Sequence, residues 1–133
     1  PTCPNAIEYL VIAGGGGAGM YTGGGGGAGG CLGNLPSSVY DNQSQGANTI
    51  ATTGTVTVTV GGGGSGNTPT WYSEDNTNGS DSSITGPMID NITANGGGRG
   101  GNYWHPSSPT LLPYSNGKDG GSGGGGSRTS SSG

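Results

Sequence analysis

The sequence contains no phenylalanine, a single histidine and only 8% charged residues. Its apolar runs are far shorter than a bilayer span, which argues against membrane insertion. Three basic against seven acidic residues give a formal net charge of −4, so the chain lacks the basic surface that nucleic acids require. Hydrophobic residues make up 26% of the 133 positions, which is too few for side-chain burial alone to offset chain entropy. We therefore expect a fold that depends largely on backbone hydrogen bonds.

Glycine is what the chain has in abundance, with 35 residues. Short apolar runs lead directly into glycine tracts, as where residues 7–13 enter 14–17 and residues 55–60 enter 61–64. A polyproline II-type chain has no internal hydrogen bonds, so consecutive glycines leave all of its edges free to bond to neighbouring chains. Collagen is excluded because there is no Gly-X-Y period. The tracts thus predict packed polyglycine II helices, with a flexible Gly/Ser linker as the alternative.

The structural glycines of this prediction are Gly14, Gly15, Gly16, Gly17, Gly23, Gly24, Gly25, Gly26, Gly27, Gly61, Gly62, Gly63 and Gly64. We expect a bulky residue at Gly25 to disrupt their packing.

The remaining pattern predicts strands and no α-helix. Strands are expected at residues 7–13, 49–53, 55–60 and 89–94. The first is almost continuously apolar and should be buried on both faces, whereas the Thr/Val alternation of 55–60 predicts one buried face. The expected fold class is all-β, a small β-sandwich or sheet combined with packed polyglycine II helices. Residues 1–126 should form one domain and residues 127–133 a flexible Ser/Gly tail.

Polar, turn-rich segments at residues 33–46, 65–87 and 102–117 are expected to be loops. The last two contain most of the aromatic residues. Large aromatic side chains either stack on sugar rings and fill partner pockets or seal subunit interfaces, and both roles remain open here. The candidate binding residues are Trp71, Tyr72, Tyr103, Trp104, His105 and Tyr114.

The order of these motifs resembles the glycine-rich domain of tailed-phage tail fibres and adhesins. The likeness rests on EYLVIAGGGGAG, GGGGGAGG, TVTVTVGGGGSG, GSDSSI, ITANGGGRGG and GKDGGSGGGGS, and it covers most of residues 7–127. A looser likeness is to the glycine-rich ectodomain of anaplastic lymphoma kinase receptors. The resemblance implies a β-sandwich joined to polyglycine II helices, a rigid extracellular module without catalytic residues, and loops at one end that bind a host surface.

Enzyme motifs are poorly supported. The pattern Gly14-x-Gly16-x-x-Gly19 matches a dinucleotide-binding fingerprint, but residues 20–30 cannot form the helix that must follow. The only histidine, His105, has no sequence partner for a catalytic triad, and no carboxylates are paired. We expect neither catalytic residues nor a cofactor.

A metal site is not expected either. The stretch Glu74-x-Asn76-x-Asn78 followed by Gly79 resembles a calcium loop, but Thr85 stands where the bidentate carboxylate belongs, so a solvated acidic turn is preferred over a weak calcium site. Two cysteines and one histidine do not make a zinc site. Cys3 and Cys31 predict an intramolecular disulfide, with a bond to a neighbouring subunit or a free thiol as alternatives.

Two functions follow from these observations. The first is a non-enzymatic extracellular or virion-borne structural and adhesive module that binds a bacterial surface glycan or outer-membrane protein. The alternative is a self-assembling subunit of an extracellular filament or tube, favoured by the edge-strand chemistry of residues 55–60 and the weakly charged surface. In either case the chain itself is an expected partner, as homo-oligomer or polymer. The start at Pro1 suggests a processed or fragmentary chain.

Overall fold

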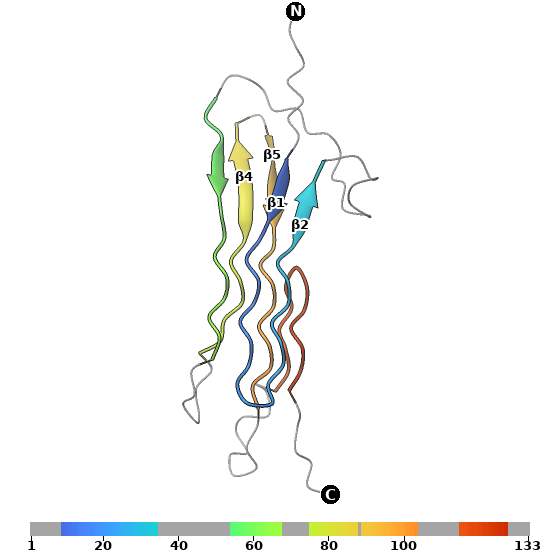
Figure 1. Cartoon of the computed structure of the whole chain (residues 1–133). Helices are drawn as coiled ribbons and strands as arrows, with labels where there is room; N and C mark the ends of the chain where they lie inside the picture. The colour runs from blue at the N-terminus through green and yellow to red at the C-terminus, as the bar shows by residue number, and fades with distance from the viewer. Residues whose placement is uncertain (1–8, 35–53, 68–74, 88, 104–114, 128–133) are drawn as a thin grey trace, which may run out of the picture.

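The computed structural model describes residues 9–34, 54–67, 75–87, 89–103 and 115–127. These residues contain no helix and form the strands β1 (Leu10–Ile12), β2 (Cys31–Gly33), β3 (Thr57–Thr59), β4 (Ser82–Gly86) and β5 (Ile89–Ala94). The strands lie together at one end of an elongated molecule, and wavy extended segments continue from them toward the other end (Figure 1). The all-β prediction is confirmed.

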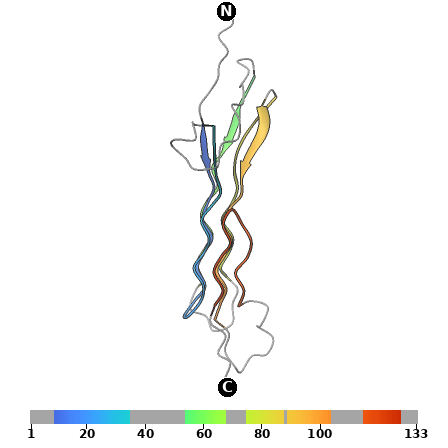
Figure 2. The same ribbon diagram turned by 90° about the vertical axis from the view of Figure 1, so that its right-hand side faces the viewer.

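The strands form two small antiparallel sheets. β1 pairs with β2, with Val11 opposite Leu32, and the second sheet has the order β3-β4-β5. β1 packs against β4 and β5, and β2 packs against β5. Figure 2 shows the strands at one end and the extended segments below them from the side. The result is a small sandwich in which the two-stranded sheet covers only part of the three-stranded one.

The core between the sheets is small. It consists of Tyr9, Val11, Ala13, Ile92 and Ala94, with Leu32 and Ile84 packed against it. The prediction that residues 7–13 are buried on both faces is wrong. Leu10 and Ile12 are exposed while their neighbours in the strand are buried, because the second sheet covers only one face of β1.

The other strand predictions had mixed outcomes. The strand within residues 89–94 is confirmed, and residues 49–53 lie outside the described part of the chain. A strand within 55–60 is confirmed as β3, but its predicted buried face is wrong because Val56, Val58 and Val60 are all exposed. β3 contacts only β4 among the strands, so neither β1 nor β2 of the two-stranded sheet covers it. The strands β2 and β4 were not predicted.

Beyond the strands, residues 13–19, 23–30, 61–67, 76–81, 95–102 and 115–127 form what we call the glycine bundle. Hydrogen bonds between its segments recur at every third residue. Ala13, Gly16 and Gly19 donate their N–H groups to the carbonyls of Gly30, Gly27 and Gly24, at 2.8–2.9 Å. A β-ladder repeats every two residues, whereas polyglycine II has three residues per turn. The predicted polyglycine II packing is therefore confirmed for these tracts, and the linker alternative is wrong for them.

The segment of residues 13–19 forms backbone hydrogen bonds to neighbouring segments on several sides. Gly14 donates to the carbonyl of Ser80 and accepts from the N–H of Gly97, while the carbonyl of Gly15 accepts from Gly64. Segments 23–30, 61–67, 76–81 and 95–102 thus all bond to it. A Cβ atom at Gly16 or Gly17 would overlap the backbone of a neighbouring segment. Only glycine permits this approach of backbones.

In tracts at the surface of the bundle, every third residue faces outward and has room for a side chain. Ala28 lies three residues after Gly25, and Ser65 three residues after Gly62, and a Cβ atom at either of these glycines would meet no atom within 4 Å. The prediction that a bulky residue at Gly25 disrupts packing is therefore contradicted. Gly25 points outward, in phase with an alanine that the sequence already tolerates.

Residues 65–87, predicted as one loop, are largely ordered into the bundle and β4. Segment 76–81 packs there although it contains a single glycine. Its side chains replace backbone carbonyls as acceptors: Oγ1 of Thr77 accepts from the N–H of Ser65, Oδ1 of Asn78 from Arg99, and Oδ1 of Asp81 from Gly96, at 2.8–3.0 Å. In this segment, polar side chains thus accept hydrogen bonds that backbone carbonyls accept in the glycine tracts.

Candidate functional site

The end of the bundle away from the sheets, here called the distal end, contains a group of polar side chains that bond to one another across the bundle. Asn67, Asn76 and Asn102 come from three different segments and form an asparagine cluster. The Nδ2 of Asn67 donates to Oδ1 of Asn102, and the Nδ2 of Asn102 donates to Oδ1 of Asn76, both at 3.0 Å. These bonds tie segments 61–67, 76–81 and 95–102 together at one level of the molecule.

Asn76 is the buried centre of this cluster, with 2% of its surface exposed. Its Nδ2 donates to the carbonyl of Gly100 at 2.6 Å, and its Oδ1 also accepts from Nη1 of Arg99 at 3.2 Å. A buried amide with every group paired costs little, whereas removing one partner leaves an unsatisfied polar group. The expectation of a solvated acidic turn here holds only in part, because Asp75, Asn78 and Asp81 are exposed, whereas Asn76 is buried and both asparagine side chains bond within the bundle. Their oxygens are already occupied, which also counts against the calcium loop.

The C-terminal residues join the same cluster. Ser127 donates its N–H to the carbonyl of Ser115 at 2.8 Å and its Oγ–H to the carbonyl of Asn102 at 2.7 Å. The bundle therefore extends one residue beyond the expected domain end at 126. Residues 128–133 lie outside the described range.

These contacts place the attachment points of two predicted aromatic segments side by side. Residues 68–74 follow Asn67, and residues 104–114 lie between Tyr103 and Ser115, so both depart from and return to the distal end. Tyr103 is partly exposed there. The other predicted binding residues lie outside the described part of the chain, namely Trp71, Tyr72, Trp104, His105 and Tyr114.

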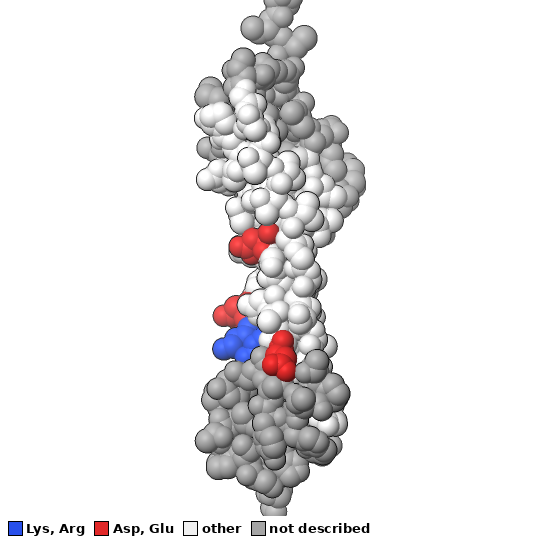
Figure 3. Space-filling view, turned by 90° about the vertical axis from the view of Figure 1, so that its left-hand side faces the viewer, with Lys and Arg blue, Asp and Glu red and all other residues white. Residues whose placement is uncertain are grey.

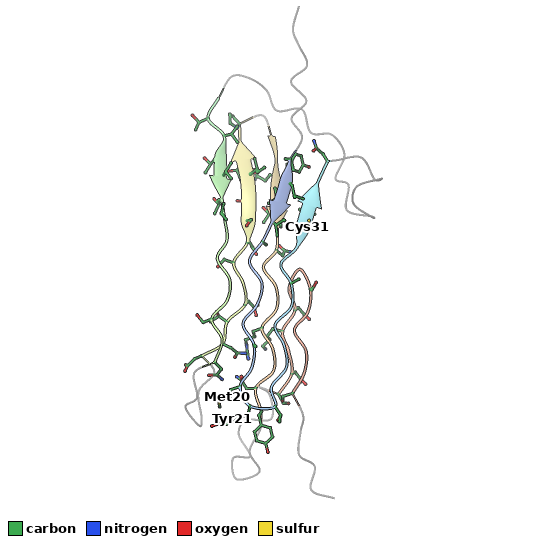
Figure 4. All side chains as sticks on the ribbon, viewed as in Figure 1. Met20, Tyr21 and Cys31 are labelled. Carbon is green, nitrogen blue, oxygen red and sulfur yellow. The ribbon has the colours of Figure 1, made fainter. Side chains whose placement is uncertain are left out.

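One aromatic residue at this end was missed. The turn at Met20–Thr22 joins two bundle segments, and in it Tyr21 has a φ of 53° and 59% of its surface exposed. Figure 4 shows Tyr21 and Met20 at the distal tip of the molecule. Left-handed backbone is unfavourable for a bulky residue, and glycine abounds on both sides of this turn. This conformation of an exposed tyrosine, which only the structure reveals, makes Tyr21 a further candidate binding residue.

Cys31, the other half of the predicted disulfide, lies in β2 at the opposite end (Figure 4). Its thiol is free and partly exposed in this structure. Cys3 lies outside the described residues, so the pairing stays a prediction.

Within the described ranges, no group of three or more histidine, cysteine, aspartate or glutamate side chains is placed to hold a metal ion. The glycines of the dinucleotide-like pattern, residues 14–19, form an extended bundle segment rather than a turn into a helix. None of the residues that the structure describes belongs to a helix long and apolar enough to cross a membrane.

The family model for a glycine-rich domain matches residues 1–133. The chain belongs to this glycine-rich domain family. No curated protein and no solved structure matches this glycine-rich domain. Family membership agrees with the bundle geometry, in which glycine is required by close backbone contact.

Proposed function

We propose that this glycine-rich domain is a non-enzymatic extracellular structural and adhesive module of the kind found in tailed-phage tail fibres. The observation that supports the proposal is the grouping at the distal end. The asparagine cluster and Ser127 fix the attachment points of residues 68–74 and 104–114 next to one another. These two segments contain Trp71, Tyr72, Trp104, His105 and Tyr114.

The bundle is suited to hold such a tip rigidly. Each segment is bonded to several neighbours, and Gly98 and Gly101 are packed so closely that a Cβ atom would overlap a neighbouring backbone. Close packing of this kind resists bending because interiors at high density are hardly compressible. The distal end is therefore carried on a stiff stem away from the sheets.

The chemistry of the tip fits a bacterial surface glycan or outer-membrane protein as partner. Tyr21 offers an exposed aromatic ring at this end, and tyrosine and tryptophan give large contact area for a small loss of side-chain entropy. A ring of this type stacks on the apolar face of a sugar or packs against an exposed protein loop. We expect the site of action to be outside the cell or on a virion.

The test replaces residues 104–114 by a Gly/Ser sequence of equal length. Tyr103 and Ser115 are retained, so the bundle contacts that hold the ends remain. The matched control replaces residues 35–53, which follow Asn34 at the sheet end. We measure binding of the fluorescently labelled chain to a panel of intact bacterial cells and their purified surface polysaccharides.

We expect the first replacement to weaken binding at least about tenfold, since recognition energy concentrates in a few aromatic residues, and the control to leave binding unchanged. If neither replacement alters cell binding, or if the unmodified chain binds none of the cells, the adhesive function is wrong. Long filaments of the unmodified chain in electron micrographs would favour the filament subunit instead.

A further inference from the structure

Exposed apolar side chains gather along one strip at the sheet end. All the large hydrophobic residues that are exposed in the described part of the chain, apart from Tyr21 at the distal tip, border this strip: Leu10, Ile12, Val56, Val58 and Val60. Val58 is 64% exposed and Val60 82%. Between β1, β3 and β4 the strip is hollowed into a groove of about 150 Å³, which we call the valine groove. Contiguous apolar surface of this kind marks an interaction site.

The groove exists because the two sheets differ in width. The two-stranded sheet covers β4 and β5, and β3 contacts only β4. Among the described residues no strand pairs with the outer edge of β3, which is the end of the order β3-β4-β5. An unpaired edge beside an apolar strip is a template for an added strand.

We propose that a second copy of this chain occupies this surface, with its β3 paired antiparallel to β3 about a two-fold axis. The sequence of residues 56–60 is self-matching under this operation. With Val58 opposite Val58 of the second copy, Val56 falls opposite Val60, and Thr57 falls opposite Thr59. An isologous interface requires one patch to be complementary to itself, and a strict two-residue alternation centred on Val58 meets that requirement.

The distribution of charge agrees with the antiparallel arrangement. No residue that lines the valine groove is charged. The described charged side chains lie in the bundle or directly beside it, namely Asp75, Asp81, Arg99, Lys118 and Asp119. Figure 3, which views the side on which β3 lies, shows charged side chains at the middle of the molecule and an uncharged described surface above them. Antiparallel copies point their bundles, and the charges on them, in opposite directions, so that only the uncharged groove regions of the two copies meet.

The first experiment measures the mass of the full 133-residue chain in solution by light scattering and sedimentation over a range of concentrations. Val58→Glu places two carboxylates opposite each other in an apolar interface, and Thr22→Glu is the control because Thr22 is exposed in the turn at the distal end, away from β3. We expect the unmodified chain and Thr22→Glu to dimerise, and Val58→Glu to raise the dimer dissociation constant about 100-fold or more. Circular dichroism checks that each variant is folded, as expected for such exposed sites.

The second experiment tests the register. In a chain with Cys3→Ser and Cys31→Ser, Val58→Cys should form an intermolecular disulfide under mild oxidation, because directly opposed Cα atoms lie about 4.5–5.5 Å apart. Thr57→Cys should not, since it faces Thr59 of the second copy. A monomer at every concentration, or a dimer that Val58→Glu leaves intact, overturns the proposal. The outcome does not depend on host binding, which the distal-end replacements test separately.

Discussion

A Cβ atom added at Gly24 would overlap the carbonyl group of Gly125, whereas one added at Gly25 would have no atom within 4 Å. Adjacent glycines in one tract thus have opposite reasons to be present. Gly24 is required because another backbone lies in the space of a side chain. Gly25 lies on the outward face, where alanine at position 28 is accepted three residues later. In this tract, two positions at which a Cβ atom would overlap a neighbouring backbone alternate with one position that has room for a side chain.

We predict opposite effects of alanine at these two neighbours. Neither glycine has a left-handed φ, so the backbone itself tolerates alanine. Gly25→Ala should stabilise the chain by about 0.4–1 kcal/mol, because it restricts only the unfolded state. Gly24→Ala should destabilise it by about 2–3 kcal/mol, because the obstacle is backbone and cannot rotate away. Urea-induced unfolding measures both, and equal shifts in midpoint would contradict the assigned faces.

The strands differ in burial although their sequences look alike. Val11 in β1 is 6% exposed and contributes to the core, while Val58 in β3 is exposed. Both follow a short β-type pattern that predicts at least one buried face. What separates them is the facing sheet, since β1 packs against β4 and β5, whereas β3 packs against neither strand of the two-stranded sheet.

The matched substitutions Val11→Ala and Val58→Ala test this difference. We expect Val11→Ala to lower the free energy of unfolding by about 2 kcal/mol, from lost burial and the cavity left behind. Val58→Ala should change it by less than about 0.5 kcal/mol. Chemical denaturation at protein concentrations low enough to keep the chain monomeric provides the measurement. A large loss at Val58 under those conditions would show that other residues of the same chain cover β3.

On the scale of the whole molecule, sheets and bundle form one continuous body. β5 runs directly into segment 95–102, and together they extend for about 45 Å at the rise of strand and polyproline II geometry. The bundle has few side chains with which to build a core of its own. The strands hold the bundle segments side by side and thereby set which of their N–H and C=O groups pair. We therefore expect the sheets and the bundle to unfold together.

Hydrogen exchange on Val11→Ala tests this coupling across the molecule. The N–H groups of Gly97 and Gly100 donate to Gly14 and Gly17 in the bundle. If the molecule opens as one unit, the free energy of opening at these amides should fall by the same amount, about 2 kcal/mol, as at the strand amides. Unchanged protection in the bundle would indicate two independently stable parts.

The sequence by itself determined the chemistry of the fold. Consecutive glycines after short apolar runs specify polyglycine II segments, because only residues without a side chain let backbones bond on every edge, and the lack of helical periodicity leaves an all-β structure. It also indicated which polar segments contain the aromatic residues. The tertiary structure alone decided which face of each tract is open, why the polar segment 76–81 joins the bundle, and how Tyr21 and the asparagine cluster meet at one end. Those outcomes depend on which segments pack against one another. A tract of consecutive glycines has no side-chain pattern from which its neighbouring segments could be predicted.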